Sequence, residues 1–221
     1  MSNRILVWDV PTRMFHWLLV LAFTVAFLTA ESERTRDIHV VFGYILLGLL
    51  AFRLIWGFIG TRYARFGSFL FGPGEVAAYV KSLVKRKPAH YVGHNPAGSM
   101  AIWLLLLLGV ASGVSGVMVY EEVGGDVLEE IHDLVSYAML GVVAVHILGV
   151  LVSSVMHREN LVRAMITGYK SDGQNAGIKR SYAWLGAIML AAVVAFWFGY
   201  PAIGQVASGG EVTHAVQNDD D

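Results

Sequence analysis

Two histidines, His132 and His146, lie inside EEIHDLVSYAMLGVVAVHILGVL (129–151), a segment apolar enough to cross a bilayer. An imidazole in hydrocarbon is costly unless something satisfies it, so an ionisable residue there is a functional candidate by default. The two are fourteen positions apart. On a helix, that spacing returns to within roughly 40° of the starting direction after a rise of about 21 Å. Both rings therefore face one side of one predicted helix, at two depths.

Two further histidines, His16 and His39, lie at the ends of other apolar segments. Because successive spans alternate in direction, His39 and His132 are expected near the outer face, and His16 and His146 nearer the cytoplasm. His39 and Arg53 are also fourteen residues apart, so one face of their span offers an imidazole outside and a guanidinium inside. An arginine within a span needs an anionic partner, and we expect a carboxylate at the inner level.

Histidine pairs at two depths indicate haem. A zinc ion needs about four ligands around one point, and pairs about 20 Å apart along a helix cannot converge on one. A porphyrin iron takes one axial ligand on each side, so two pairs indicate two haems. The chain has no cysteine, which excludes disulfides and covalent haem attachment and leaves non-covalent haem b. Six-coordinate iron has no open position, which favours electron transfer, and we expect no catalytic residue.

A single histidine in an apolar segment would more often have a packing role. Haem is favoured because the four histidines fall into two pairs, each at its own depth. The remaining histidines fall in predicted loops or the tail: His90, His94, His157 and His214. We do not expect them to be haem ligands. His94, in GHNPAG, and His157 could stand near a quinone or proton site at the cytoplasmic interface.

The composition places the whole chain in the membrane class. It has 221 residues, of which 56% are hydrophobic and 15% charged, with a mean hydropathy of +0.57. A span needs about 20 apolar residues. Five segments qualify, at about 13–30, 39–60, 97–120, 131–155 and 182–201. The N-terminal MSNRILVWDVPTRMFHW lacks the pattern of a signal peptide, so the first span is expected to be retained. Nothing in the sequence indicates nucleic-acid binding.

The loops predict the orientation. Most of the 16 basic residues fall in the N-terminal segment, in 61–96 and in 156–181, whereas acidic residues dominate the opposite loops and the tail. The positive-inside rule then places the N-terminus in the cytoplasm and the C-terminus in the periplasm of a bacterial inner membrane. The acidic set is Glu31, Glu33, Asp37, Glu121, Glu122, Asp126, Glu129, Glu130, Glu211 and Asp219 to Asp221.

Two shorter patterns are also informative. The segment PGEVAAYVKSLVKRK (73–87) predicts an amphipathic helix on the surface. We interpret this helix as a connector between two spans rather than as a docking site. GVASGVSGV puts Gly109, Gly113 and Gly116 close to one helical face. Small residues let another surface approach closely, and that surface could be a neighbouring helix or a flat cofactor.

Four motifs, in order, carry a family resemblance: DVPTRMFHW, HVVFGYILLGLLAFRLIWGFIG, HYVGHNPAGSM and EEIHDLVSYAMLGVVAVHILGVL. Together they resemble the bacterial cytochrome b561 family, which includes the b-type cytochrome subunit of nickel–iron hydrogenases. The resemblance covers about residues 4–165. It implies a four-helix bundle that binds two haems b, with axial ligands matching His16, His39, His132 and His146. It also implies electron transfer between a membrane quinone pool and a redox partner outside.

The predicted fold is therefore an all-α integral membrane protein in two parts. Residues 1–165 form the dihaem bundle. Residues 166–221 add a cytoplasmic connection, a fifth transmembrane helix at about 182–201 and an acidic extracytoplasmic tail. The fifth helix contains no candidate ligand, so it is either a packing helix or a docking element.

Three functions are consistent with the sequence. The leading one is a dihaem cytochrome that relays electrons between quinone and a periplasmic protein, such as a hydrogenase or a c-type cytochrome. The second is a self-contained superoxide or quinone oxidoreductase. The third is a haem-free membrane anchor or assembly protein, which would leave the depth pairing of the histidines unexplained.

Overall fold

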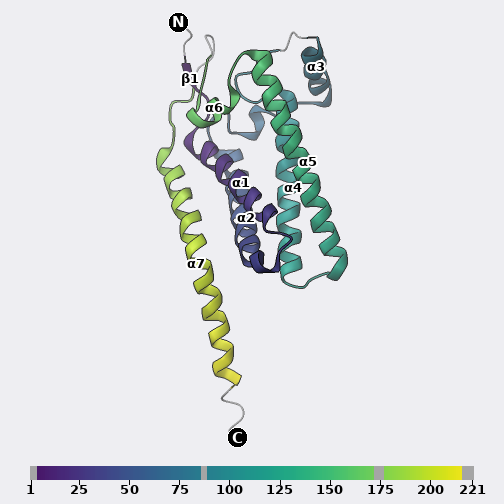
Figure 1. Cartoon of the computed structure of the whole chain (residues 1–221). Coiled ribbons are helices and arrows are strands. Elements are labelled where there is room, and N and C mark those ends of the chain that lie inside the picture. Colours follow the sequence, from purple (N-terminus) through teal and green to yellow (C-terminus); the bar gives the residue numbers. More distant parts are fainter. Residues whose placement is uncertain (1–3, 86–88, 172–176, 216–221) are drawn as a thin grey trace.

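The structure is a computed structural model that describes residues 4–85, 89–171 and 177–215, with side chains as far as Tyr200. Helices dominate it (Figure 1). The helices are α1 (Val10–Leu28), α2 (Arg36–Ile59), α3 (Pro73–Val84), α4 (Pro96–Tyr120), α5 (Gly125–His157), α6 (Leu161–Thr167) and α7 (Ala183–Ala215). Two short strands, β1 (Arg4–Leu6) and β2 (Tyr169–Ser171), and two 3-10 turns, Glu33–Thr35 and Phe66–Ser68, complete the described elements.

Within the described residues, five helices are long and apolar enough to cross a membrane, which confirms the five predicted spans. α4 packs along α5, α1 along α2, and α2 against α4; α7 lies along the outside of α1 (Figure 1). The core between them contains Phe15, Leu46, Leu49, Leu50 and Leu106. The helical membrane fold is thus confirmed, with α3 where the amphipathic helix was predicted.

The outer surface of the helices is apolar. On α5, Leu134 and Val145 are 70% and 64% exposed, and Leu148 is 61% exposed. A soluble monomer rarely leaves so large an apolar surface open to water, whereas lipid tails cover it at no cost. The chain is a multi-pass membrane protein.

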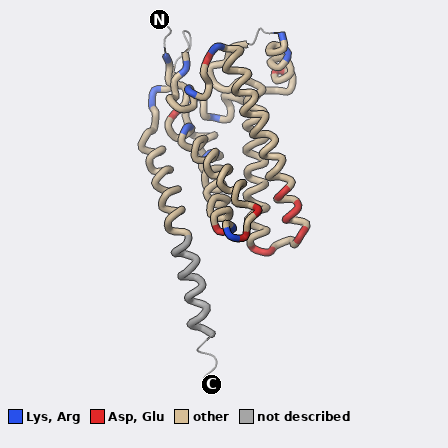
Figure 2. The backbone as a smooth tube through the Cα atoms, in the orientation of Figure 1, with Lys and Arg blue, Asp and Glu red and all other residues tan. Residues whose placement is uncertain are grey.

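Charged residues gather at the two ends of the bundle (Figure 2). Most of the described lysines and arginines lie toward the end that carries β1, and most of the acidic residues at the end with the α1–α2 and α4–α5 connections, where Arg34 and Arg36 are the basic exceptions. These ends are called the basic end and the acidic end below. The last acidic residues, Asp219 to Asp221, and the basic residues Arg86 and Lys87 lie outside the described residues.

A small cap at the basic end was not predicted from the sequence. β1 pairs antiparallel with β2, with Ile5 opposite Lys170. Gly168 precedes β2 at φ +87°, and its carbonyl accepts the backbone N–H groups of Val7 and Trp8. A Cβ there would lie 2.7 Å from the carbonyl oxygen of Trp8, so only glycine fits. The cap joins the N-terminus to the connection between α6 and α7.

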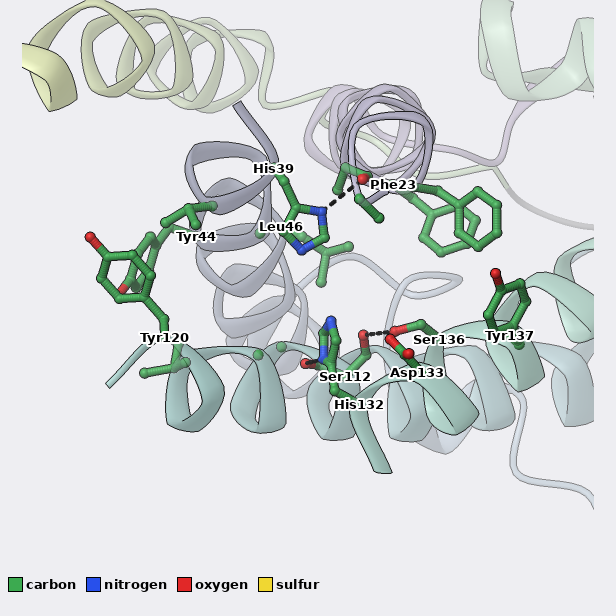
Figure 3. A pocket seen from close by; sticks show the side chains of 18 of the residues that line it. Phe23, His39, Tyr44, Leu46, Ser112, Tyr120, His132, Asp133, Ser136 and Tyr137 are labelled. Atoms are coloured by element: carbon green, nitrogen blue, oxygen red, sulfur yellow. Dashed lines mark hydrogen bonds between the residues drawn. The ribbon is translucent and has the colours of Figure 1, made fainter. Parts of the chain in front are cut away.

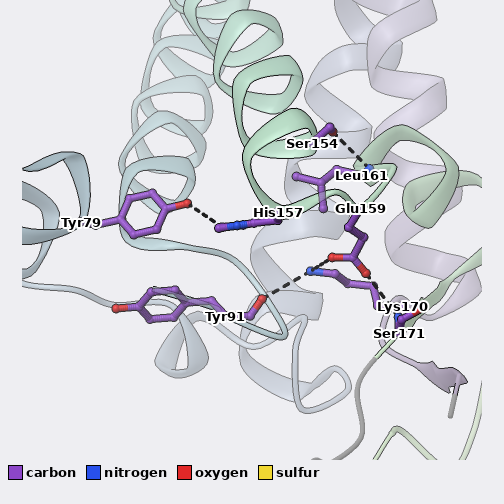
Figure 4. Close-up of polar contacts among 8 residues, drawn as sticks. All are labelled: Tyr79, Tyr91, Ser154, His157, Glu159, Leu161, Lys170 and Ser171. Atoms are coloured by element: carbon purple, nitrogen blue, oxygen red, sulfur yellow. Dashed lines mark hydrogen bonds and ion pairs between the residues drawn. The ribbon is translucent and has the colours of Figure 1, made fainter. Parts of the chain in front are cut away.

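A buried ion pair holds the same cap together (Figure 4). Lys170 is 6% exposed, and its Nζ lies 3.3 Å from Oε2 of Glu159 and donates to the carbonyl of Tyr91. The other carboxylate oxygen of Glu159 accepts the N–H of Ser171. The loop before α4 is thereby fixed to the residues that follow α5.

Asp9 joins the start of α1 to the end of α2. It is fully buried and caps α1 by accepting the N–H of Thr12 at 2.7 Å. Its second oxygen accepts the Trp56 indole N–H at 3.2 Å and the Thr61 hydroxyl. Every one of these donors would lose its partner if the carboxylate were removed.

Replacing Asp9 by alanine should therefore lower the free energy of unfolding by about 2–4 kcal/mol, because a helix cap is lost and buried donors are left unpaired. Thermal melting of the detergent-solubilised protein measures this. Asp126→Ala removes an exposed carboxylate from the first turn of α5 and should cost less than about 1 kcal/mol. Equal melting temperatures for the two variants would contradict the role of Asp9.

Candidate haem sites

His39 and His132 meet near the acidic end. His39 lies in the first turns of α2 and His132 in the early part of α5, and their ring centres are 6.1 Å apart with planes at 89°. Figure 3 shows the two rings projecting toward one another from opposite walls of a pocket. This is the pair that alternation of the spans predicts for the outer level.

The second nitrogen of each ring is already occupied. Nδ1 of His39 lies 2.8 Å from the carbonyl oxygen of Ala26, and Nδ1 of His132 lies 3.0 Å from that of Ser112. A carbonyl only accepts, so each Nδ1 carries the proton and donates it. The lone pair is then on Nε2, and Figure 3 shows these nitrogens facing each other. A histidine ligand is commonly fixed in this tautomer by a carbonyl behind it.

The spacing of the rings fits one metal ion between them. Imidazole nitrogens bond transition metals at about 2 Å, which places the centres of two opposed rings about 6 Å apart. The observed 6.1 Å agrees with that arrangement. Among the described residues no cluster of three or more His, Asp or Glu could hold a metal ion by itself. A pair of opposed imidazoles fits the requirement of an iron porphyrin for two protein ligands.

The pocket around the pair has a volume of about 320 Å³, within the range of ligand pockets. Phe23, Tyr44, Tyr120 and Tyr137 supply much of its wall. Two glycines of α4, Gly113 and Gly116, also line it.

Gly109, Gly113 and Gly116 of α4 each lie against a side chain of a neighbouring helix, which is the first of the two alternatives that the sequence left open. A Cβ on Gly109 would lie 3.1 Å from Leu50 of α2, so this glycine serves helix packing. A Cβ on Gly116 would lie 2.9 Å from Cε1 of His132. Gly116 therefore leaves room for the imidazole of the pocket.

His16 and His146 belong to a second group nearer the basic end. The two imidazoles lie within electrostatic range of each other and of the loop residue His94. Nδ1 of His16 is covered and has no hydrogen-bond partner. At this level the chain leaves polar atoms unpaired, unlike at the outer pair.

Arg53 lies in the same region and is 3% exposed. Its guanidinium carbon is 4.9 Å from the ring centre of Phe66 and 5.8 Å from that of Phe69. The expected carboxylate nearby is Asp9, but its oxygens already accept the hydrogen bonds that hold α1 and α2 together. No ion pair to Arg53 is present among the described residues, and its Nη1 has no partner.

His94, which the sequence suggested only as a residue near a quinone or proton site, is buried in this region. Its ring centre is 4.6 Å from those of both Trp8 and Phe69. Burial lowers the pKa of His94 to about 3, and the positive charge of Arg53 and Lys170 adds to the effect. The imidazole is neutral at physiological pH. Its position in GHNPAG, immediately before the Asn95 cap of α4, is the signal that could have indicated a fixed rather than a loose loop.

Tyr79 and His157 form a separate contact at the basic end. The Tyr79 hydroxyl lies 3.4 Å from Nε2 of His157 (Figure 4). The ring centre of His90 lies 5.9 Å from that of His157. Burial raises the pKa of Tyr79, so its phenol stays protonated. This contact docks α3 onto the end of α5.

Comparison with known proteins identifies the fold and its haem. Residues 7–168 match the family described as prokaryotic cytochrome b561. The chain belongs to this family. As a cytochrome b561 it is a membrane protein that binds haem b and transfers electrons. The match spans α1 to α6, so it contains all four histidines of the two groups.

Several similar curated proteins are named "Probable Ni/Fe-hydrogenase B-type cytochrome subunit". That of Rhodobacter capsulatus is 24% identical over 215 residues, covering 76% of this chain and 82% of that protein. That of Azotobacter vinelandii is 25% identical over 217 residues, covering 76% and 89%. The hydrogenase 1 subunit of Escherichia coli K12 is 24% identical over 212 residues, covering 75% and 90%. No solved structure matches this cytochrome.

A glycine in α2 makes room for the aromatic residues beneath Arg53. A Cβ on the buried Gly57 would lie 2.2 Å from the ring of Phe66. Gly57→Ala should displace that ring and lower the free energy of unfolding by about 1–3 kcal/mol. Thermal melting in detergent measures the loss.

Gly141→Ala in α5 is the matched control, because nothing lies within 4 Å of its Cβ position. We expect it to be neutral or slightly stabilising. If the Gly57→Ala and Gly141→Ala variants had the same melting temperature, the position of the Phe66 ring against α2 would be contradicted.

Proposed function

We propose that this cytochrome holds two haems b, one between His39 and His132 at the acidic end and one between His16 and His146 nearer the basic end. The observation that carries the proposal is the outer pair, with each Nδ1 occupied by a carbonyl and each Nε2 facing the other. The spacing of His132 and His146 on α5 then gives the inner level. Residues 1–165 form the dihaem bundle, and α7 is an addition to it.

Each haem would supply an iron that changes oxidation state by one electron. The chain contributes the axial nitrogens, an apolar wall that excludes water, and Arg53 as a cation at the inner level. With a histidine pair at each level, the iron would have no open position for a substrate, and its role would be electron relay.

The cytochrome would exchange electrons with the quinone pool on one side and with a redox protein on the other. The charge distribution favours a cytoplasmic basic end and a periplasmic acidic end. The names of the relatives point to a nickel–iron hydrogenase as the partner. The exposed acidic residues of the α4–α5 connection and the first turns of α5, including Glu121, Glu129 and Glu130, could instead receive a basic c-type cytochrome.

The haem count tests the core of the proposal. Purified wild-type protein should contain two haems b per chain by the pyridine haemochrome assay. His146→Ala should contain one, because the inner iron loses an axial ligand while the outer pair is intact. His39→Ala should contain one for the converse reason, and the two variants should retain haems of different midpoint potential.

His157→Ala is the control, because this histidine contacts Tyr79 rather than the inner group; it should keep both haems. A wild-type count below two would refute the dihaem assignment. Two haems retained in His146→Ala would refute the pairing.

Reduction by hydrogen tests the partner. In vesicles that contain the cytochrome and a purified nickel–iron hydrogenase, hydrogen should reduce both haems, and a soluble quinone analogue should reoxidise them. His146→Ala should still allow reduction of the outer haem but slow reoxidation by quinone, because the inner relay is missing. The absorbance of the reduced haems follows both steps.

Haems that dithionite reduces but hydrogen does not would exclude hydrogenase as the partner. Reduction by a basic c-type cytochrome that falls steeply with ionic strength would then favour the other candidate. Reduction by superoxide alone, without a partner protein, would indicate the self-contained oxidoreductase.

A further inference from the structure

Three nitrogen-bearing side chains surround one buried aromatic ring near the basic end. Phe69 is completely buried. The guanidinium of Arg53 lies 5.8 Å from its ring centre, His94 lies 4.6 Å away and Trp103 lies 5.8 Å away. These residues come from α2, from the loop before α4 and from α4, so the fold brings them together from three separate segments.

Each of the three has a covered nitrogen without a hydrogen-bond partner. The atoms are Nη1 of Arg53, Nδ1 of His94 and Nε1 of Trp103. The hydroxyl of Ser99, one turn before Trp103 on α4, is unpaired as well. A buried polar group without a partner costs about 1–3 kcal/mol. Such groups are rare in native proteins, so several at one place require an explanation.

The chemistry of these atoms defines what would satisfy them. A guanidinium and an indole N–H can only donate, and a neutral imidazole can donate from one nitrogen. The matching group is therefore an acceptor, and the unpaired charge of Arg53 makes an anion the best one. A carboxylate accepts several hydrogen bonds at once and pairs well with arginine.

The described part of the chain does not provide that carboxylate. Asp9 accepts hydrogen bonds from Thr12, Trp56 and Thr61. Glu159 is paired with Lys170 and Ser171. A bound group would supply the acceptor that the described residues lack.

We infer that Arg53, His94 and Trp103 form a carboxylate cradle, and that it receives a carboxylate side chain of the inner haem. The inference rests on the proposed inner haem between His16 and His146, both of which lie within electrostatic range of His94. His94 and Trp103 are positioning residues: they orient the haem through its edge and do not ligate the iron. Each donor also offsets negative charge close to the iron and so raises the midpoint potential of the inner haem.

Trp103→Phe and His94→Phe test the cradle in the full-length protein. Both substitutions keep a ring against Phe69 and remove the donor nitrogen. We expect both variants to contain two haems. In a potentiometric titration the inner midpoint potential should fall and the outer one should stay unchanged, because the carboxylate keeps more of its negative charge. The propionate bending band in the resonance Raman spectrum should shift as well. His94→Gln, which restores a donor, should recover part of the fall.

His90→Phe and Trp184→Phe are matched controls, since both residues are exposed and lie outside the cradle. Unchanged inner potential and Raman band in both cradle variants, as would follow if water alone satisfied the donors, would overturn the inference and leave the dihaem assignment intact. Altered g values of the inner haem in His94→Phe would also overturn it, because His94 would then be an iron ligand. If the His94→Phe variant lost the inner haem, the inner midpoint potential and the Raman band of the Trp103→Phe variant would test the inference instead. A wild-type protein with one haem would instead refute the proposed function.

Discussion

The structure depends on the cost of keeping an imidazole in hydrocarbon. A histidine there must have partners for both ring nitrogens, and α-helical backbone offers few, because its carbonyls are already used within the helix. The outer pair meets half of this requirement within the chain: Ala26 near the end of α1 and Ser112 in α4 provide carbonyls for His39 and His132. The other half, one Nε2 on each ring, is directed into the pocket. The fold thus prepares two identical lone pairs facing one another.

The polar side chains at the two levels of the bundle differ in whether they have hydrogen-bond partners within the chain. At the outer level the polar atoms of the ring pair find partners in the backbone and in Ser115. At the inner level His16, Arg53 and His94 each retain a covered nitrogen without one. The surrounding structure is nevertheless firmly held, because β1, β2 and the Lys170–Glu159 pair close the basic end above it. Unpaired donors in a fixed site indicate preparation for a ligand.

Much of this architecture could be predicted from the sequence, because its signals are periodic. Hydropathy located the five spans, and the fourteen-residue spacing in α5 placed His132 and His146 on one face. The strand pair could not be predicted: each strand has three residues, and more than 160 positions separate them, so neither composition nor periodicity marks the pairing. The burial of His94 could not be predicted from the sequence for a similar reason. Its environment is made by Trp8 and Phe69, which reach it from other segments. The axial roles of the four histidines remain predictions.

In the proposed dihaem arrangement, α5 is the element that fixes the distance between the two levels. It supplies one histidine to each level, and a helix rises about 1.5 Å per residue, so the vertical separation of the levels is set at about 21 Å by covalent geometry and hydrogen bonds. In the proposed arrangement the partners of His132 and His146 come from two other helices, α2 and α1. Movement of α1 would change the inner site alone, whereas α2 carries both His39 and Arg53, so its movement would affect both levels. The proposed cradle joins Arg53 of α2 to His94 and Trp103 at the start of α4, and it would act on the potential of the inner haem.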